Sequence, residues 1–87
     1  MNAIDYFATR EKQLRIEKGL TIQELANILN SKSGDGISKS AISRYENGER
    51  EPSARFLRYF AEFYGVSIDY LLGLVDDPKG KYGGGTI

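Results

Sequence analysis

The sequence predicts an all-α fold built from short helices, and three observations carry this prediction. Two neighbouring segments, residues 20–29 and 38–48, each begin with a capping residue and continue with apolar residues at helical spacing. Two further segments begin in the same way, after Ser53 and Ser67. A glycine, which tolerates the left-handed backbone that ends many helices, closes several of these segments, as at Gly48.

The first helix is predicted over residues 3–18, where Ile4, Phe7 and Leu14 lie at spacings that can face a core. Glu11 interrupts this apolar stripe between Phe7 and Leu14. Either the Glu11 side chain swings to solvent, or the helix starts at a different position.

The second helix, residues 20–29, has a clear start signal. Thr21 and Glu24 form a capping box, in which each side chain accepts a hydrogen bond from the backbone N–H of the other residue. Leu20 and Leu25 occupy the positions of a hydrophobic staple around this cap. The apolar stripe of the helix consists of Leu25, Ile28 and Leu29.

The third helix lies within residues 38–48. The hydroxyl of Ser38 can accept a hydrogen bond from an unpaired backbone N–H of the first turn, and the Asn-Gly pair at the other end can stop the helix. Ile42 and Tyr45 are three residues apart and therefore share one face. Two short capped helices in succession are typical of a helix-turn-helix, whose second helix enters the major groove of DNA.

The opposite face of this third helix is small, polar, cationic and free of acidic residues. It consists of Lys39, Ser40, Ser43 and Arg44. Lysine and arginine can donate to guanine O6 and N7, and serine can bond to most base edges, so this face fits a DNA major groove. The alternative is an ordinary solvated surface, because many surface helices are rich in serine and lysine and bind nothing.

The fourth helix, residues 54–64, is rich in aromatic side chains. Phe56, Phe60 and Phe63 keep helical spacing, so they are predicted to supply core area rather than a stacking surface for bases or a cofactor. Two tyrosines of this helix are predicted to reach the surface or a partner, Tyr59 and Tyr64.

The fifth helix is predicted over residues 68–73, with the inward-facing side chains Ile68, Leu71 and Leu72. Residues 75–87 are polar and rich in glycine, and such a segment cannot bury enough surface to remain ordered alone. The predicted organisation is a helical domain over residues 1–74 and a flexible Gly-rich tail over residues 75–87. This tail can be a linker, a non-native end or an arm that orders on a partner.

Six sequence blocks carry a family resemblance through their order and spacing. They are Leu14-Arg15, Lys18-Gly19-Leu20-Thr21, Glu24-Leu25-Ala26, Ile42-Ser43-Arg44-Tyr45-Glu46-Asn47-Gly48, Glu51-Pro52-Ser53 and Phe63–Gly73. With these blocks the chain resembles, over about residues 4–74, the phage-repressor type of helix-turn-helix domain, the Cro/repressor or xenobiotic-response-element family. The resemblance implies a five-helix lambda-repressor-like domain that binds DNA through its third helix, usually as a dimer on a palindromic operator.

The resemblance also implies roles for single residues. The base-reading positions fall on Lys39, Ser40, Ser43 and Arg44. Arg44 is the best candidate for a bidentate guanine contact, worth ~1–3 kcal/mol of discrimination. Contacts to DNA phosphate are expected from Thr21, Gln23, Ser38 and Asn47, with Arg50 and Arg55 past the turn. A structural ion pair that ties the first helix to the third falls on Arg15 and Glu46.

The chain departs from the family pattern in two places. Ile22 stands where the family often carries a glutamine that contacts phosphate, so one backbone contact is missing. About six extra residues, Ser31–Gly36, extend the turn between the second and third helices and are expected to form a flexible loop. This loop is either a tolerated surface insertion or a longer wing whose Lys32 touches phosphate.

Composition narrows the possible functions. Twelve Lys and Arg residues balance twelve Asp and Glu residues, but residues 10–58 hold ten basic and seven acidic side chains, a local excess of three. The absence of cysteine and histidine excludes disulfides and leaves no usual ligands for zinc and no usual base for a serine triad. We therefore expect neither an enzyme nor a bound metal or cofactor. Arg10 and Lys12 are expected to be solvated surface charges.

The leading expectation is a sequence-specific regulator of transcription, most simply a repressor, that binds double-stranded DNA as a homodimer. The predicted dimer surface includes Tyr70, Leu74 and Val75. The alternative is an antitoxin or protein-interaction module of the same fold, with a protein partner on the 75–87 tail. No secretion signal and no apolar run of the ~20 residues needed for a membrane span is found, so a cytoplasmic, bacterial or phage-encoded protein without membrane contact is expected.

Overall fold

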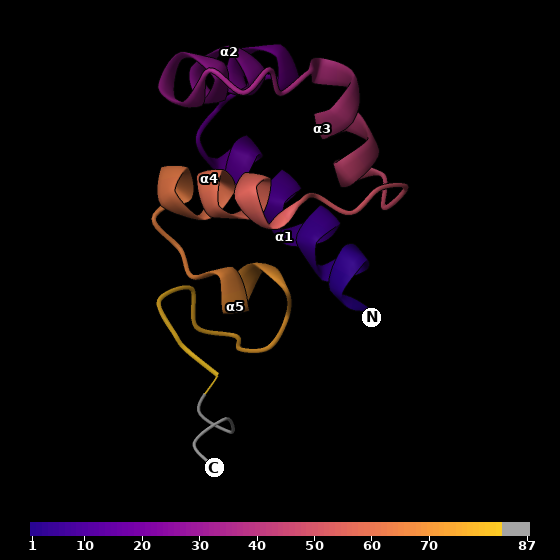
Figure 1. The fold of residues 1–87 in the computed structure, drawn as a ribbon. Helices are drawn as coiled ribbons and strands as arrows, with labels where there is room; N and C mark the ends of the chain where they lie inside the picture. Colours follow the sequence, from indigo (N-terminus) through magenta and orange to yellow (C-terminus); the bar gives the residue numbers. More distant parts are fainter. Residues whose placement is uncertain (83–87) are drawn as a thin grey trace.

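The computed structural model describes residues 1–82. Within them the chain forms five helices and no strand, which confirms the predicted all-α fold. The helices are α1 (Ala3–Glu17), α2 (Ile22–Ser33), α3 (Lys39–Glu46), α4 (Ala54–Tyr64) and α5 (Ile68–Leu71). Figure 1 shows α2 above α4, α3 at one end of this pair and α5 below it. α1 contacts both α3 and α5, so the first helix joins the two ends of the domain.

The core forms where these helices meet. Its centre is a cluster of three aromatic rings from three helices, Phe7 of α1, Tyr45 of α3 and Phe60 of α4, each at most 1% exposed. The rings pack edge to face, with centroids 5.2–6.1 Å apart, which is a favourable geometry for aromatic pairs. This cluster fixes α3 against α1 and α4 and thereby fixes which face of α3 remains outside.

Each helix begins at a polar cap residue, as the sequence predicts for four of them. Thr21, Ser38, Ser53 and Ser67 each accept a hydrogen bond from the backbone N–H three residues ahead. The capping box of α2 is complete, because Glu24 in turn accepts from the backbone N–H of Thr21 at 2.8 Å. These caps satisfy N–H groups that have no partner inside a helix.

The expectation that Glu11 turns to solvent, or that the first helix starts elsewhere, is wrong. α1 starts at Ala3 as predicted, and Glu11 is fully buried with 0% exposure. Tyr64 of α4 is also buried, at 9%, rather than on the surface, and its hydroxyl donates to Oε1 of Glu11 at 2.9 Å. Each polar group supplies the buried partner that the other one needs.

The extra residues between the second and third helices do not all form a loop. α2 continues to Ser33, one turn beyond the predicted end, and Gly34 closes it in the left-handed conformation with φ 71°. The hydroxyls of Ser31 and Ser33 donate to carbonyls of the preceding turn, so these two serines stay helical. The prediction of a loop over Ser31–Gly36 is therefore wrong for its first three residues.

Two side chains tie down the remaining turn. Asn30 pairs with the backbone of Ile37 in both directions, donating to its carbonyl at 2.7 Å and accepting from its N–H at 2.6 Å. Asp35 accepts from the hydroxyl of Tyr59 and lies 3.7 Å from Arg55, both on α4. The turn is thus anchored at its base and at its tip before the chain enters α3.

The last helix is shorter than predicted. α5 ends at Leu71, which is fully buried, whereas Leu72 is half-buried and Ile68 is 37% exposed. The prediction that Ile68 packs inward is wrong. α5 has only one turn, and in it only the side chain of Leu71 is buried in the core. On α4, Phe60 is buried while Phe56, Phe63 and Tyr59 are half-buried against the core.

Arg10 is not the solvated surface charge that the sequence indicates. Its guanidinium donates to the carbonyls of Tyr70 at 2.5 Å and Val75 at 2.7 Å and pairs with Asp76 at 3.0 Å. It also lies over the rings of Tyr6 and Tyr70, with 5.0 and 4.2 Å to the centroids. Arg10 therefore fastens α1 to α5 and to the segment that follows it.

That segment is only partly within the described residues. Over residues 75–82 it contacts the link between α4 and α5, where the N–H of Ser67 donates to the carbonyl of Pro78 at 2.7 Å and Lys79 donates to the carbonyl of Gly65. Residues 83–87 of the predicted tail lie outside the described residues. The division at residue 74 stays a prediction. Across residues 1–82, no helix is both long and apolar enough to cross a lipid bilayer.

Candidate nucleic-acid interface

α3 is a short helix held from one side. Its apolar residues Ala41, Ile42 and Tyr45 are 0–7% exposed and pack into the core. On the other side Lys39, Ser40 and Arg44 are exposed and Ser43 is half-buried. The predicted apolar and polar faces of this helix are therefore the ones that the fold buries and exposes.

The exposed side of α3 borders a surface hollow of about 500 Å³. Its walls are Lys39, Ser40, Ser43, Arg44, Asn47 and Glu49. The structure thus brings together all four residues predicted to contact bases, and it adds one predicted phosphate contact, Asn47. Within residues 1–82 neither Lys39 nor Arg44 forms a salt bridge, so both positive charges face the hollow uncompensated by an ion pair.

Glu49 is the member of this hollow that sequence reasoning missed. Gly48 takes the left-handed conformation with φ 71° and turns the chain back toward α3, where the N–H of Glu49 donates to the carbonyl of Arg44 at 2.9 Å. The sequence signal was available, because an Asn-Gly stop leaves the next residue beside the last turn of the helix. The face of α3 is free of acid, but the hollow beside it is not.

The chemistry of the hollow suits the edges of base pairs. Lysine and arginine donate to guanine O6 and N7, asparagine can bond to adenine in two places, and a carboxylate accepts from cytosine N4. Donors and acceptors thus line a single exposed surface beside α3.

The other predicted phosphate contacts lie outside the hollow. Thr21 and Gln23 are exposed on the first turn of α2, where the oxygen of Thr21 already accepts from Glu24 and the amide of Gln23 donates to Asn27 at 3.0 Å. Lys32 is exposed on the last turn of α2 rather than on a loop. Three more candidates are also exposed, Ser38, Arg50 and Arg55.

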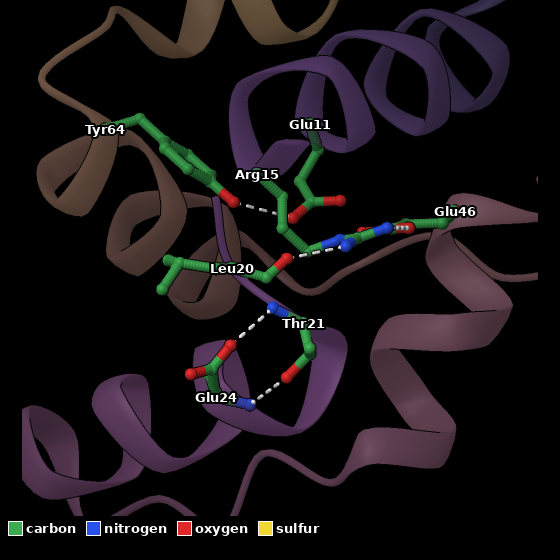
Figure 2. A network of polar contacts seen from close by, with 7 residues as sticks. All are labelled: Glu11, Arg15, Leu20, Thr21, Glu24, Glu46 and Tyr64. Carbon is green, nitrogen blue, oxygen red and sulfur yellow. Dashed lines mark hydrogen bonds and ion pairs between the residues drawn. The ribbon is translucent and has the colours of Figure 1, made fainter. Parts of the chain in front are cut away.

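A network of partly buried polar side chains links the end of α3 to α1 and to the start of α2 (Figure 2). Arg15 donates to both carboxylate oxygens of Glu46, at 2.7 and 2.8 Å, so the structure brings the predicted structural ion pair together. A third donor of Arg15 bonds to the carbonyl of Leu20 at 2.8 Å, just before the capping box of α2. One guanidinium thus links α1 to the end of α3 and to the start of α2.

The surroundings act differently on the ionisable groups of this network. Burial raises the pKa of Glu46, but the hydrogen bond from Arg15 and further favourable contacts outweigh burial, so this pKa lies below its usual value. Burial, together with the neighbouring Glu46, raises the pKa of Glu11 to about 9. Burial, and then Glu11, also raises the pKa of Tyr64. The two carboxyl groups of this network therefore have pKa values shifted in opposite directions.

No group of acidic side chains suited to hold a metal ion occurs within residues 1–82. The candidate site presents hydrogen-bonding and charged side chains on α3 and its surroundings.

Comparison with known proteins agrees with this geometry. A helix-turn-helix family model matches residues 12–71. The chain is 39% identical over 75 residues to an uncharacterized HTH-type transcriptional regulator, YobD of Bacillus subtilis, covering 86% of this chain and 62% of the relative. It is 33% identical to the cryptic phage CTXphi transcriptional repressor RstR of Vibrio cholerae, covering 76% of this chain and 54% of the relative.

A third relative differs in the direction of its effect on transcription. The HTH-type transcriptional activator BcrR of Enterococcus faecalis is 36% identical, over 76% of this chain and 29% of the relative. The chain therefore spans between about a third and two thirds of the length of these proteins, and what they share with it is the helical domain. The chain belongs to the helix-turn-helix family of DNA-binding domains.

Proposed function

We propose that the chain binds double-stranded DNA in a sequence-specific manner and regulates transcription. The observation that carries the proposal is the exposed face of α3, where Lys39, Ser40, Ser43 and Arg44 line one hollow while the opposite face is locked in the core. Relatives named as transcriptional regulators support it. The family is one of DNA-binding proteins rather than enzymes.

Each side chain of the hollow has a proposed role. Arg44 makes a bidentate contact to guanine, Lys39 donates to a second base edge, and the two serines bond to neighbouring edges. Thr21 and Gln23 on the first turn of α2 hold phosphate, where the free N–H groups of the helix start favour an anion. Ser38, Asn47, Lys32 and Arg50 add further phosphate contacts around α3.

We further propose that the protein represses transcription as a dimer on a palindromic operator. One small domain covers a single half-site, so two copies are needed to read a full operator. Repression requires only that the operator is occupied, and a relative named as a phage repressor supports this direction. The exposed Leu74, with Val75 and Tyr70 beside it, remains the proposed dimer surface.

Selection of binding sites from a random duplex library tests the proposal. We expect an inverted repeat bound at least ~10³ times more tightly than random DNA, with an affinity that falls steeply as salt rises. The variant Lys39→Ala/Arg44→Ala should lose this preference. The control Lys18→Ala/Lys81→Ala removes the same charge away from α3 and should keep it.

Weak binding without sequence preference would reject the proposal. An endogenous protein that copurifies with the chain under those conditions would then favour an antitoxin or a protein-interaction module of the same fold.

A further inference from the structure

Glu11 is a buried acid that the proposed DNA contacts leave unexplained. It lies in the middle of α1 with 0% exposure. Its Oε1 atom accepts from the hydroxyl of Tyr64 at 2.9 Å, whereas its Oε2 atom is buried without a hydrogen-bond partner. A buried carboxylate oxygen that lacks a donor is costly, and such an oxygen needs an explanation.

Among the described residues, no positively charged side chain donates a hydrogen bond to Glu11. The titratable groups that face it are Tyr64 from α4, Glu46 from α3 and Arg15 from α1, with Lys12 near Glu46. Arg15 directs two donors to Glu46 and a third to the carbonyl of Leu20. Figure 2 shows the guanidinium extended toward Glu46, with Glu11 above it.

The carboxyl groups of Glu11 and Glu46 lie close enough for each to shift the pKa of the other. Two ionised carboxylates can only accept, so they would repel each other. A proton on one of them turns this repulsion into a hydrogen bond. Glu46 keeps its charge because both of its oxygens are bound by Arg15, so the proton belongs on Glu11, and the oxygen without a partner is the atom that can carry it.

We propose that Glu11 is a neutral carboxylic acid whose Oε2–H donates to Glu46, and that it is a positioning residue for α3. The Glu46 carboxylate is then held by Arg15 and by Glu11, and Tyr64 completes the chain of bonds into α4. Glu46 is the last residue of α3, so this network fixes the end of the helix that carries Arg44. The effect on DNA binding rests on the proposed function.

Loss of the Glu11 proton has a defined consequence. It places a second negative charge near Glu46, on a side chain that has no exposure to water. Separation of α1 from α3 is the way to relieve this repulsion, and it displaces the face that contacts bases. The raised pKa of about 9, caused first by burial and then by Glu46, places this loss on the alkaline side of neutrality.

The first test is a titration of the full chain with ¹³C-labelled glutamate, followed by NMR. We expect the carboxyl carbon of Glu11, assigned as the signal missing in Glu11→Gln, to titrate near pH 9. The amides at the end of α3 should shift with the same midpoint. A Glu11 signal that titrates near its ordinary value of 4.5 would overturn the proposal.

The second test is the pH dependence of operator binding. Glutamine keeps one acceptor and one donor and does not titrate, so Glu11→Gln should bind within about twofold of the wild type at pH 7. Between pH 8 and 10 the wild type should lose up to about tenfold in affinity while Glu11→Gln stays level. Parallel losses in both proteins would contradict the proposed role.

Tyr64→Phe is the matched control, since it removes only the bond to Oε1. That bond lowers the pKa of Glu11, so its loss should move the titration to higher pH and leave the Glu46 bond in place. If no variant binds any DNA, the proposed function fails. The NMR titration still decides whether Glu11 carries the proton, so the two failures are distinguishable.

Discussion

At the scale of single residues, the support of the candidate site depends on one guanidinium, that of Arg15, which binds several acceptors. Three donors of Arg15 are each committed, two to Glu46 and one to Leu20. Arg15 binds both oxygens of Glu46 and lowers its pKa, whereas burial first, and then Glu46, raises the pKa of Glu11. Two carboxyl groups in one network thus have pKa values shifted in opposite directions.

This division predicts how stability depends on pH. The pKa of Glu11 is raised in the folded state, so its contribution is fully present below 4.5 and is lost progressively as pH rises to about 9. The slope is at most about 1.4 kcal/mol per pH unit. Urea unfolding of the wild type at pH 5, 7 and 9 should show this decline, and Glu11→Gln should not. The titration of Glu46 does not hide this decline, because the lowered pKa of Glu46 changes the stability only below about pH 4.5. Equal slopes in the two proteins would show that Glu11 is ionised in the fold.

Glu49 adds a negative charge to the lining of the hollow. We expect this charge to repel DNA phosphates and to weaken binding. Glu49→Gln should bind random duplex DNA several times more tightly and discriminate less between operators, because the repulsion of phosphate is removed and the charged acceptor for cytosine becomes a weaker, neutral amide oxygen. Competition binding against random DNA measures both effects. Glu51→Gln removes the same charge from an exposed position that does not line the hollow. An equal gain in both variants would leave Glu49 with no special role.

At the scale of the elements, the turn between α2 and α3 is held by side chains rather than by length alone. Asn30→Ala should leave the N–H and carbonyl of Ile37 without partners and destabilise the protein by about 1–3 kcal/mol. Faster hydrogen exchange at Ile37 and at the start of α3 is the measurement. Ser31→Ala, which removes one exposed bond, should change little. Unchanged exchange in Asn30→Ala would show that the turn holds its shape without this pair.

The elements also show which parts of the structure can be predicted from the sequence. The caps at Thr21, Ser38, Ser53 and Ser67 join residues three apart, so a local pattern is enough to find them. The end of α2 was missed because serine can bond either to its own helix or to a turn, and composition does not choose between these states.

Contacts between residues far apart in the sequence could not be predicted in the same way. The Glu11–Tyr64 bond spans 53 positions, and the bonds of Arg10 to Tyr70 and Val75 span 60 and 65. The helical spacing placed Glu11 on the apolar stripe of α1 and gave no such signal for Arg10, and the partners of both residues became known only from the fold. For the candidate site, the face of α3 was predictable from its period, whereas Glu49 joined the hollow through a backbone reversal.

At the scale of the whole molecule, an exposed apolar side chain beside α5 predicts how two copies meet. Leu74 is 52% exposed and Ile68 is 37% exposed, whereas the ring of Tyr70 is held under Arg10. Leu74→Glu should weaken dimerisation at least tenfold, because a charge in an apolar contact is unfavourable. Sedimentation equilibrium measures the change, and Ile16→Glu serves as a control on the exposed side of α1. The same association constant in both variants would place the dimer surface elsewhere.

The contacts of α1 also imply an order of folding during synthesis. α1 leaves the ribosome first, yet its buried polar groups wait for Glu46, Tyr64 and finally Asp76, which are 31, 53 and 66 positions further along the chain. The helix-turn-helix, whose partners are near in sequence, closes its loops earlier. In a nascent chain stalled before Val75 we expect α2 and α3 to be formed while α1 still lacks the bonds of Arg10 to Val75 and Asp76. The final polar contact of α1, between Arg10 and Asp76, forms only when nearly the whole described chain has emerged.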